Sequence, residues 1–126
     1  MNVTMLTDDQ LARLEEVLRE PIHSGKGKNG LKDACVMQMT DWVYRNADHW
    51  TDKPECVSPS ITRFMIAWND AMNDADRQRL KPYIPRLVGT RSTKAVERRR
   101  SWLACDWLVR TFTPTWLRLA DLTEDA

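Results

Sequence analysis

Apolar residues recur along this chain at the three- and four-residue spacing of a helix, and no stretch alternates apolar and polar residues for long as a strand does. The clearest helix follows Ser58, a favourable N-cap residue, and Pro59, which suits the first helical position. The apolar residues that share one face of this helix are Ile61, Phe64, Met65, Trp68 and Met72. The spacing therefore predicts an all-α fold.

Capping signals and prolines divide the rest of the chain into further helices. Thr7 and Gln10 have the spacing of a capping box, and they predict a helix over residues 7–20 that ends at Pro21. The other predicted helices cover residues 31–47, 73–80, 92–112 and 113–122, with an irregular segment at 81–89 that contains two prolines. Asn73 is the expected cap of the 73–80 helix, and Ser92 or Thr93 is the expected cap of the 92–112 helix. The second half of the 92–112 segment is apolar almost all round, which predicts that this helix lies at the centre of the core.

The length of 126 residues suits one domain. We therefore expect a single compact domain of five to six helices over residues 1–126. Within it, residues 1–30 form an acidic helix and a Gly/Lys loop, and residues 31–122 form the core helical region. The six Trp and six Met residues are numerous enough to fill a small helical core.

The three cysteines, Cys35, Cys56 and Cys105, are odd in number and include no CxxC pair, which favours a reducing, cytoplasmic setting over a disulfide framework. Cys35, His49 and Cys56 are weak candidates for a zinc site, because they lack the tight ligand spacing that such sites use. Buried packing is the stronger interpretation of the cysteines, so no metal or cofactor is expected. The start of the chain lacks a basic leader, and no apolar run reaches the roughly 20 residues of a membrane span, so no membrane partner is expected.

Residue types that carry catalysis are present but not in a catalytic pattern. His23 lies next to Ser24, yet neighbours along the chain imply no triad. Asp70, Asp74 and Asp76 are better explained as helix caps and solvated charges than as an acid/base pair. The loop "SGKGKNG" lacks the spacing of a phosphate-binding loop. The sequence therefore predicts a protein that is not an enzyme.

Basic side chains concentrate between residues 86 and 100, in a chain whose net charge is only +1. The candidate anion-binding residues are Arg86, Arg91, Lys94, Arg98, Arg99 and Arg100. Arginine forms bidentate contacts with phosphate and carboxylate groups, and a helix N-terminus also favours anions. Two interpretations stay open: the arginines bind an anionic ligand, a nucleotide or a nucleic acid, or acidic residues of the same chain neutralise them.

A second class of function is a protein–protein interaction factor, which inhibits a host protein or forms a homo-oligomer through exposed Trp and Met residues. Trp50, in a polar loop, is the candidate anchor, although a loop tryptophan is more often folded back on its own domain. Lys26 and Lys28, in the Gly/Lys loop, are further candidate contact residues.

Three short stretches carry a family resemblance: "CVSP" at Cys56–Pro59, "PRLVGTR" at Pro85–Arg91 and "DWLVR" at Asp106–Arg110. Over roughly residues 31–122, the chain resembles small uncharacterised proteins of actinobacteria and their phages. The resemblance implies a phage or prophage accessory role and supplies no mechanism.

Overall fold

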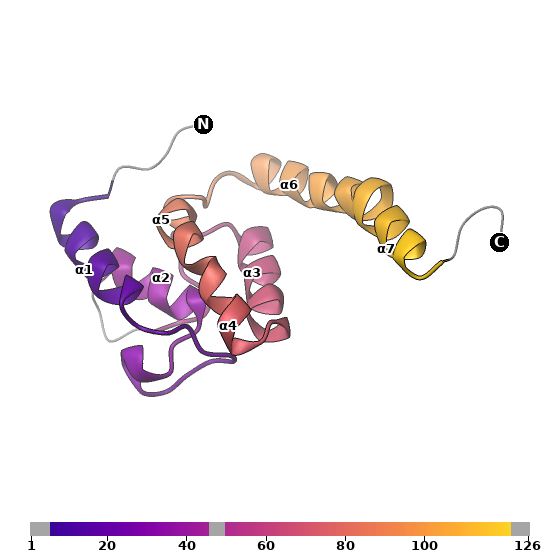
Figure 1. Cartoon of the computed structure of the whole chain (residues 1–126). Coiled ribbons are helices and arrows are strands. Elements are labelled where there is room, and N and C mark those ends of the chain that lie inside the picture. Colours follow the sequence, from indigo (N-terminus) through magenta and orange to yellow (C-terminus); the bar gives the residue numbers. More distant parts are fainter. Residues whose placement is uncertain (1–5, 46–49, 122–126) are drawn as a thin grey trace. The chain divides into compact units, whose positions relative to one another are not determined.

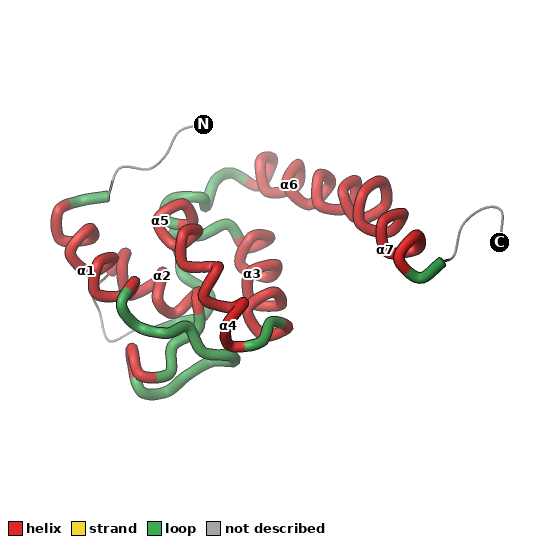
Figure 2. Tube along the Cα trace, viewed as in Figure 1, coloured by secondary structure: helices red, strands yellow, loops and turns green. Residues whose placement is uncertain are grey.

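The computed structural model describes residues 6–45 and 50–121, and these contain helices and no strand (Figures 1 and 2). The prediction of an all-α fold is therefore confirmed. The chain divides into two compact units, Met1–Ser92 and Thr93–Ala126, where the sequence led us to expect one domain over residues 1–126. The division arises because Lys94–Leu119 forms successive helical segments in which no residue is buried.

Helix α1 (Asp8–Leu18) begins with the predicted capping box. The Gln10 backbone N–H donates to Thr7 Oγ1 over 3.2 Å, and the Thr7 backbone N–H donates to Gln10 Oε1 over 2.9 Å. Leu14 and Val17 are its buried residues. The acidic residues Asp8 and Asp9 lie in the first turn, where the helix dipole favours negative charge.

The central helix of the first unit is α2 (Val36–Arg45), which contacts α1, α3 and α5. It is buried along most of its length, and its buried residues are Val36, Met37, Gln38, Met39, Thr40, Asp41 and Val43. The helix begins later than the predicted Leu31, since residues 30–32 form a short 3-10 turn (η1, Gly30–Lys32). The Cys35 N–H, just before α2, donates to Gln38 Oε1 over 3.1 Å.

Helix α3 (Pro59–Ala71) has the predicted start, with the Ile61 N–H donating to the Oγ of the N-cap residue Ser58 over 3.4 Å. Its buried residues are Thr62, Met65 and Asn69. Phe64 and Trp68 belong to the predicted apolar face, but both side chains are exposed, so only part of that face is in the core.

Three short elements follow α3: α4 (Asp74–Arg77), the 3-10 helix η2 (Gln78–Tyr83) and α5 (Ile84–Leu87). Asn73 caps α4 as predicted, accepting the Asp76 N–H over 2.8 Å. Residues 81–87 were expected to be irregular, yet they are helical in short pieces, because Pro82 lies within the 3-10 segment and Pro85 in the first turn of α5. Leu80, Ile84 and Leu87 from these elements are buried in the core.

The second unit is described by three successive helical segments, α6 (Lys94–Trp107), the π-helical turn η3 (Leu108–Phe112) and α7 (Thr113–Leu119). Thr93 caps α6 as predicted, with the Val96 N–H donating to Thr93 Oγ1 over 3.2 Å. The expectation that this helix forms the centre of the core is wrong, because none of its residues is buried. Apolar residues all round a helix indicate contact on several sides, and the core is built instead around α2.

Candidate functional site

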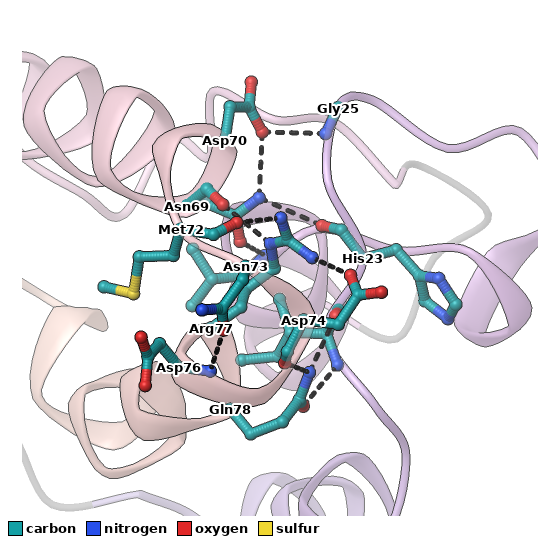
Figure 3. A network of polar contacts seen from close by, with 12 residues as sticks. His23, Gly25, Asn69, Asp70, Met72, Asn73, Asp74, Asp76, Arg77 and Gln78 are labelled. Carbon is teal, nitrogen blue, oxygen red and sulfur yellow. Dashed lines mark hydrogen bonds and ion pairs between the residues drawn. The ribbon is translucent and has the colours of Figure 1, made fainter.

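The densest polar network of the first unit surrounds Arg77, which is almost completely buried (Figure 3). Its guanidinium donates to the Asn69 carbonyl over 2.7 Å, to the Met72 carbonyl and to the Asp74 carboxylate. Gln78 extends the network, accepting the Ile22 N–H over 2.7 Å and donating to the Ile22 carbonyl over 3.0 Å. These groups bind mainly backbone atoms, so the network holds segments of the first unit together.

Asn69, which has no exposed surface, joins three segments within the same network (Figure 3). Its Oδ1 accepts the Val36 N–H over 3.1 Å, and its Nδ2 donates to the His23 carbonyl and to Asp70 Oδ1, each over 2.9 Å. Asp70 Oδ1 also accepts the Gly25 N–H over 2.7 Å. His23 and Asp70, which the sequence analysis weighed as catalytic residues, thus take part in structural contacts.

The Gly/Lys loop is held in place by hydrogen bonds to Asp33. The Lys28 and Asn29 N–H groups donate to the Asp33 carboxylate over 3.0 and 2.8 Å, and they lower the pKa of Asp33. Gly27 has no room for a side chain, since a Cβ there would lie 2.1 Å from the Asp33 carbonyl oxygen. The side chains of Lys26 and Lys28 are exposed on this loop and available to a partner.

Trp50, the candidate interface anchor, is packed within its own unit. Its ring stacks on Trp42, with 5.6 Å between centroids and 9° between planes, and it packs against the hydrophobic core. A Cβ on Gly30 would lie 3.4 Å from the same ring. This arrangement corresponds to the folded-back alternative rather than to an exposed anchor.

The weak metal candidates do not gather into a site in the described part of the chain. Cys35 and Cys56 are buried free thiols, and His49 lies outside the described residues. Cys105 is exposed, so the expectation of buried packing is wrong for this residue, because its helix has no buried residue. Burial raises the pKa of the Cys35 and Cys56 thiols, which keeps both protonated and unreactive. Within residues 6–45 and 50–121, no group of three or more His, Cys, Asp or Glu side chains is placed to hold a metal ion.

A cavity of about 500 Å³ lies at the surface of the first unit where α3, α4 and η2 meet. Its lining residues are Trp68, Met72, Asp76, Arg79, Leu80 and Tyr83. Trp68 contacts the Phe64 ring at 5.4 Å and the Tyr83 ring at 5.9 Å between centroids. These aromatic contacts are structural, and the cavity contains both a carboxylate and a guanidinium.

A smaller cavity, about 180 Å³, lies at the start of α3. Its lining residues are Lys53, Pro54, Pro59, Thr62, Arg63, Ile66 and Arg91. Of the predicted anion-binding residues only Arg91 lines it, and the structure adds Lys53 and Arg63, which sequence reasoning missed. No local signal connects these three residues, because they come from separate segments that meet only in the folded chain.

The six predicted anion-binding residues do not belong to one element. Arg86 and Arg91 are exposed in the first unit, whereas Lys94, Arg98, Arg99 and Arg100 lie on α6 in the second. Arg100 forms an ion pair with Glu97 at 3.5 Å, so part of the charge is neutralised locally. Arg98 and Arg99 make no ion pair with any described residue.

The second unit exposes large apolar side chains, and six of them were expected in the core: Trp102, Leu103, Trp107, Leu108, Val109 and Phe112. Val96, Trp116 and Leu119 are exposed as well. The π-helical turn brings Trp107 and Phe112 together, with 5.4 Å between ring centroids, although they are five positions apart. The helix surface is therefore aromatic and aliphatic after a basic first half.

The structure thus defines an all-α protein with a buried core in one unit and an exposed apolar helix in the other. Comparison with known proteins gives no match to any protein family, curated protein or solved structure. The resemblance to small actinobacterial and phage proteins stays a prediction. No helix among the described segments combines the length and the apolar character that crossing a bilayer requires.

Proposed function

We propose that this chain is a binding protein without chemistry of its own, whose second unit docks on an acidic partner protein. The helical segment Lys94–Leu119 is the docking element, and its partner presents an apolar groove edged with carboxylates. The exposure of large apolar side chains on this segment is the observation that carries the proposal. Trp102 is 69% exposed and Leu119 is 82% exposed.

The size of the exposed apolar surface is that of a protein interface. The three tryptophans, Phe112 and the neighbouring aliphatic side chains present on the order of 1,000 Å². A stable interface buries about 800 Å² on each partner. Monomeric proteins rarely expose a contiguous apolar patch of more than a few hundred Å². The surface therefore has the size of a docking element.

The distribution of these side chains around the helix favours a groove over a flat contact. At about 100° per residue, Leu103 and Trp107 lie on one side of the helix and Trp102 on another. A second identical helix would cover only one of these sides. A groove covers several sides at once, as in recognition of an amphipathic helix by a larger partner.

The charge of the segment favours an acidic partner. It carries six basic residues and two carboxylates, Glu97 and Asp106, and these two pair with Arg100 and Arg110. Four cations stay without an ion pair among the described residues: Lys94, Arg98, Arg99 and Arg118. The same charges would repel a second copy of the segment and are complementary to carboxylates at the rim of a groove.

Aliphatic residues such as Leu103 and Leu119 favour a protein partner over a nucleic acid. Proteins that bind nucleic acids use flat aromatic platforms and carry a larger basic excess. The family resemblance adds a phage or prophage accessory role to this proposal, with the partner in the cytoplasm of the host.

The test combines crosslinking with measured binding. A photo-reactive benzophenone side chain in place of Leu103 identifies the macromolecule that contacts the segment, and that macromolecule is then purified. We expect a protein whose dissociation constant rises about thirtyfold with Trp107→Ala, as for a buried aromatic anchor, and at least fivefold with Arg99→Glu. Trp68→Ala and Arg79→Glu, in the first unit, are the matched controls and should leave the constant unchanged.

Three results would overturn the proposal. The first is crosslinking only to a second copy of the chain, with a dimer in light scattering that Trp107→Ala dissolves. The second is a nucleic acid or a lipid vesicle as the crosslinked or bound species. The third is a protein partner whose affinity is the same for the wild type and for Trp107→Ala.

A further inference from the structure

The small cavity at the start of α3 is lined by three cations and no carboxylate. Lys53 comes from the loop before α3, Arg63 from α3 itself and Arg91 from the segment after α5. None of the three forms an ion pair with a described residue. Three like charges around one cavity repel each other, and a bound anion relieves this repulsion.

Glu55 and Asp41, two acidic residues near these segments, form ion pairs with Arg45 and not with the cations of the cavity. Glu55 follows Lys53 by two positions, but its carboxylate pairs with Arg45. Asp41, the other acid beside Arg45, is fully buried in α2. The positive end of the α3 dipole adds to the field of the three cations, because Pro59 and Arg63 lie in the first turns of this helix.

Backbone hydrogen bonds hold the Arg91 segment next to the start of α3. The Arg91 N–H donates to the Cys56 carbonyl over 3.1 Å, and the Ser58 N–H donates to Thr90 Oγ1 over 3.0 Å. Thr90 Oγ1 donates in turn to the Leu87 carbonyl over 2.7 Å. The Arg91 backbone is therefore fixed in position before any ligand binds, which reduces the entropic cost of binding.

We propose that this cavity binds a phosphate group, either as free phosphate or at the end of a small phosphomonoester. Two arginines offer the forked N–H geometry that matches phosphate oxygens. A volume of about 180 Å³ equals about six water molecules at about 30 Å³ each, which leaves room for a tetrahedral anion and part of an attached group. Pro54, Pro59 and Ile66 form the apolar wall that such an attached group would contact.

This inference is independent of the proposed docking role, because the cavity belongs to the first unit and the docking element to the second. Either proposal can fail while the other stands.

Isothermal titration of the full chain with inorganic phosphate and with phenyl phosphate tests the inference, at constant ionic strength set with sodium chloride. We expect saturable binding that weakens at least tenfold in the Arg63→Ala/Arg91→Ala double variant. Arg79→Ala removes an exposed arginine from the same unit and is the matched control, which should bind as the wild type does. If phenyl phosphate binds more tightly, the ligand of the cavity is a phosphomonoester. If inorganic phosphate binds equally or more tightly, the ligand is the free ion.

The inference is overturned if neither probe binds, if chloride competes as well as phosphate, or if the double variant binds as the wild type does. Both substituted side chains are exposed, so the double variant should keep the wild-type circular dichroism spectrum and melting temperature. A phosphorus NMR titration of the Lys53→Ala variant should show weaker phosphate binding than the wild type does. Phosphate signals as broad as those with the wild type at every concentration would contradict a three-cation site.

Discussion

Asn69 stabilises the first unit because one buried amide satisfies backbone groups from two distant segments, at Val36 and His23. Replacing it with alanine leaves the Val36 N–H and the His23 carbonyl without these partners inside the protein. Each unsatisfied buried group costs about 1–3 kcal/mol. Buried amides such as Asn69 and Gln38, which bind several backbone groups each, therefore contribute strongly to the free energy of unfolding.

We expect Asn69→Ala to lower the free energy of unfolding by about 3 kcal/mol. Urea denaturation followed by circular dichroism measures this change. Asn29→Ala, at an exposed position with one side-chain bond to Asp33, is the control and should cost about 0.5 kcal/mol. Equal effects of the two substitutions would show that the buried network does not stabilise the unit.

At the scale of elements, the π-helical turn η3 determines which side chains of the second unit lie together. Pro114 lacks the N–H that an α-helix would donate to the Arg110 carbonyl, and its ring would clash there. The wider turn accommodates the proline, and the Thr113 hydroxyl donates to the Leu108 carbonyl over 2.6 Å. Trp107 and Phe112 come into contact as a result.

Pro114→Ala should therefore convert the π turn into regular α-helix. Alanine is favoured over proline in a helix interior by about 3 kcal/mol, so helical circular dichroism should rise. The contact between the Trp107 and Phe112 rings should be lost, and proton NMR cross-peaks between them report it. Cross-peaks that persist at wild-type intensity would mean that the proline does not cause the turn.

The predictability of each element depends on how far apart its determinants lie along the chain. The caps at Thr7, Ser58, Asn73 and Thr93 were predicted, because each needs a partner only three positions away. The later start of α2 was not predicted, since Asp33 and Gln38 bind the preceding loop at Lys28 and Gly27, positions five and eleven residues away.

The candidate sites also depend on residues that lie far apart along the chain. The second half of the 92–112 segment is apolar almost all round, which indicates contact on several sides, but the pattern does not say whether the contact is within the chain or with a partner. Lys53, Arg63 and Arg91 meet through tertiary structure alone, so the sequence identified only Arg91, as part of a basic run.

At the scale of the whole molecule, the described core is confined to the first unit. Among the described residues, every buried apolar one lies between Leu14 and Val88. We therefore expect a chain that ends at Ser92 to unfold cooperatively in urea, with a defined near-ultraviolet circular dichroism signal from Trp42 and Trp50. A featureless near-ultraviolet spectrum and a gradual transition would contradict a core that is complete in this unit.

The tryptophans are divided between the two units, three in each. Trp42, Trp50 and Trp68 belong to the first, and Trp102, Trp107 and Trp116 are exposed on the second. Indoles in water fluoresce at longer wavelengths than indoles in an apolar environment. The protein thus contains its own optical reporter. A partner that covers the second unit shifts the tryptophan emission to shorter wavelengths without an added label. A phosphate bound at Arg63, in the first unit, leaves the emission of Trp102, Trp107 and Trp116 unchanged.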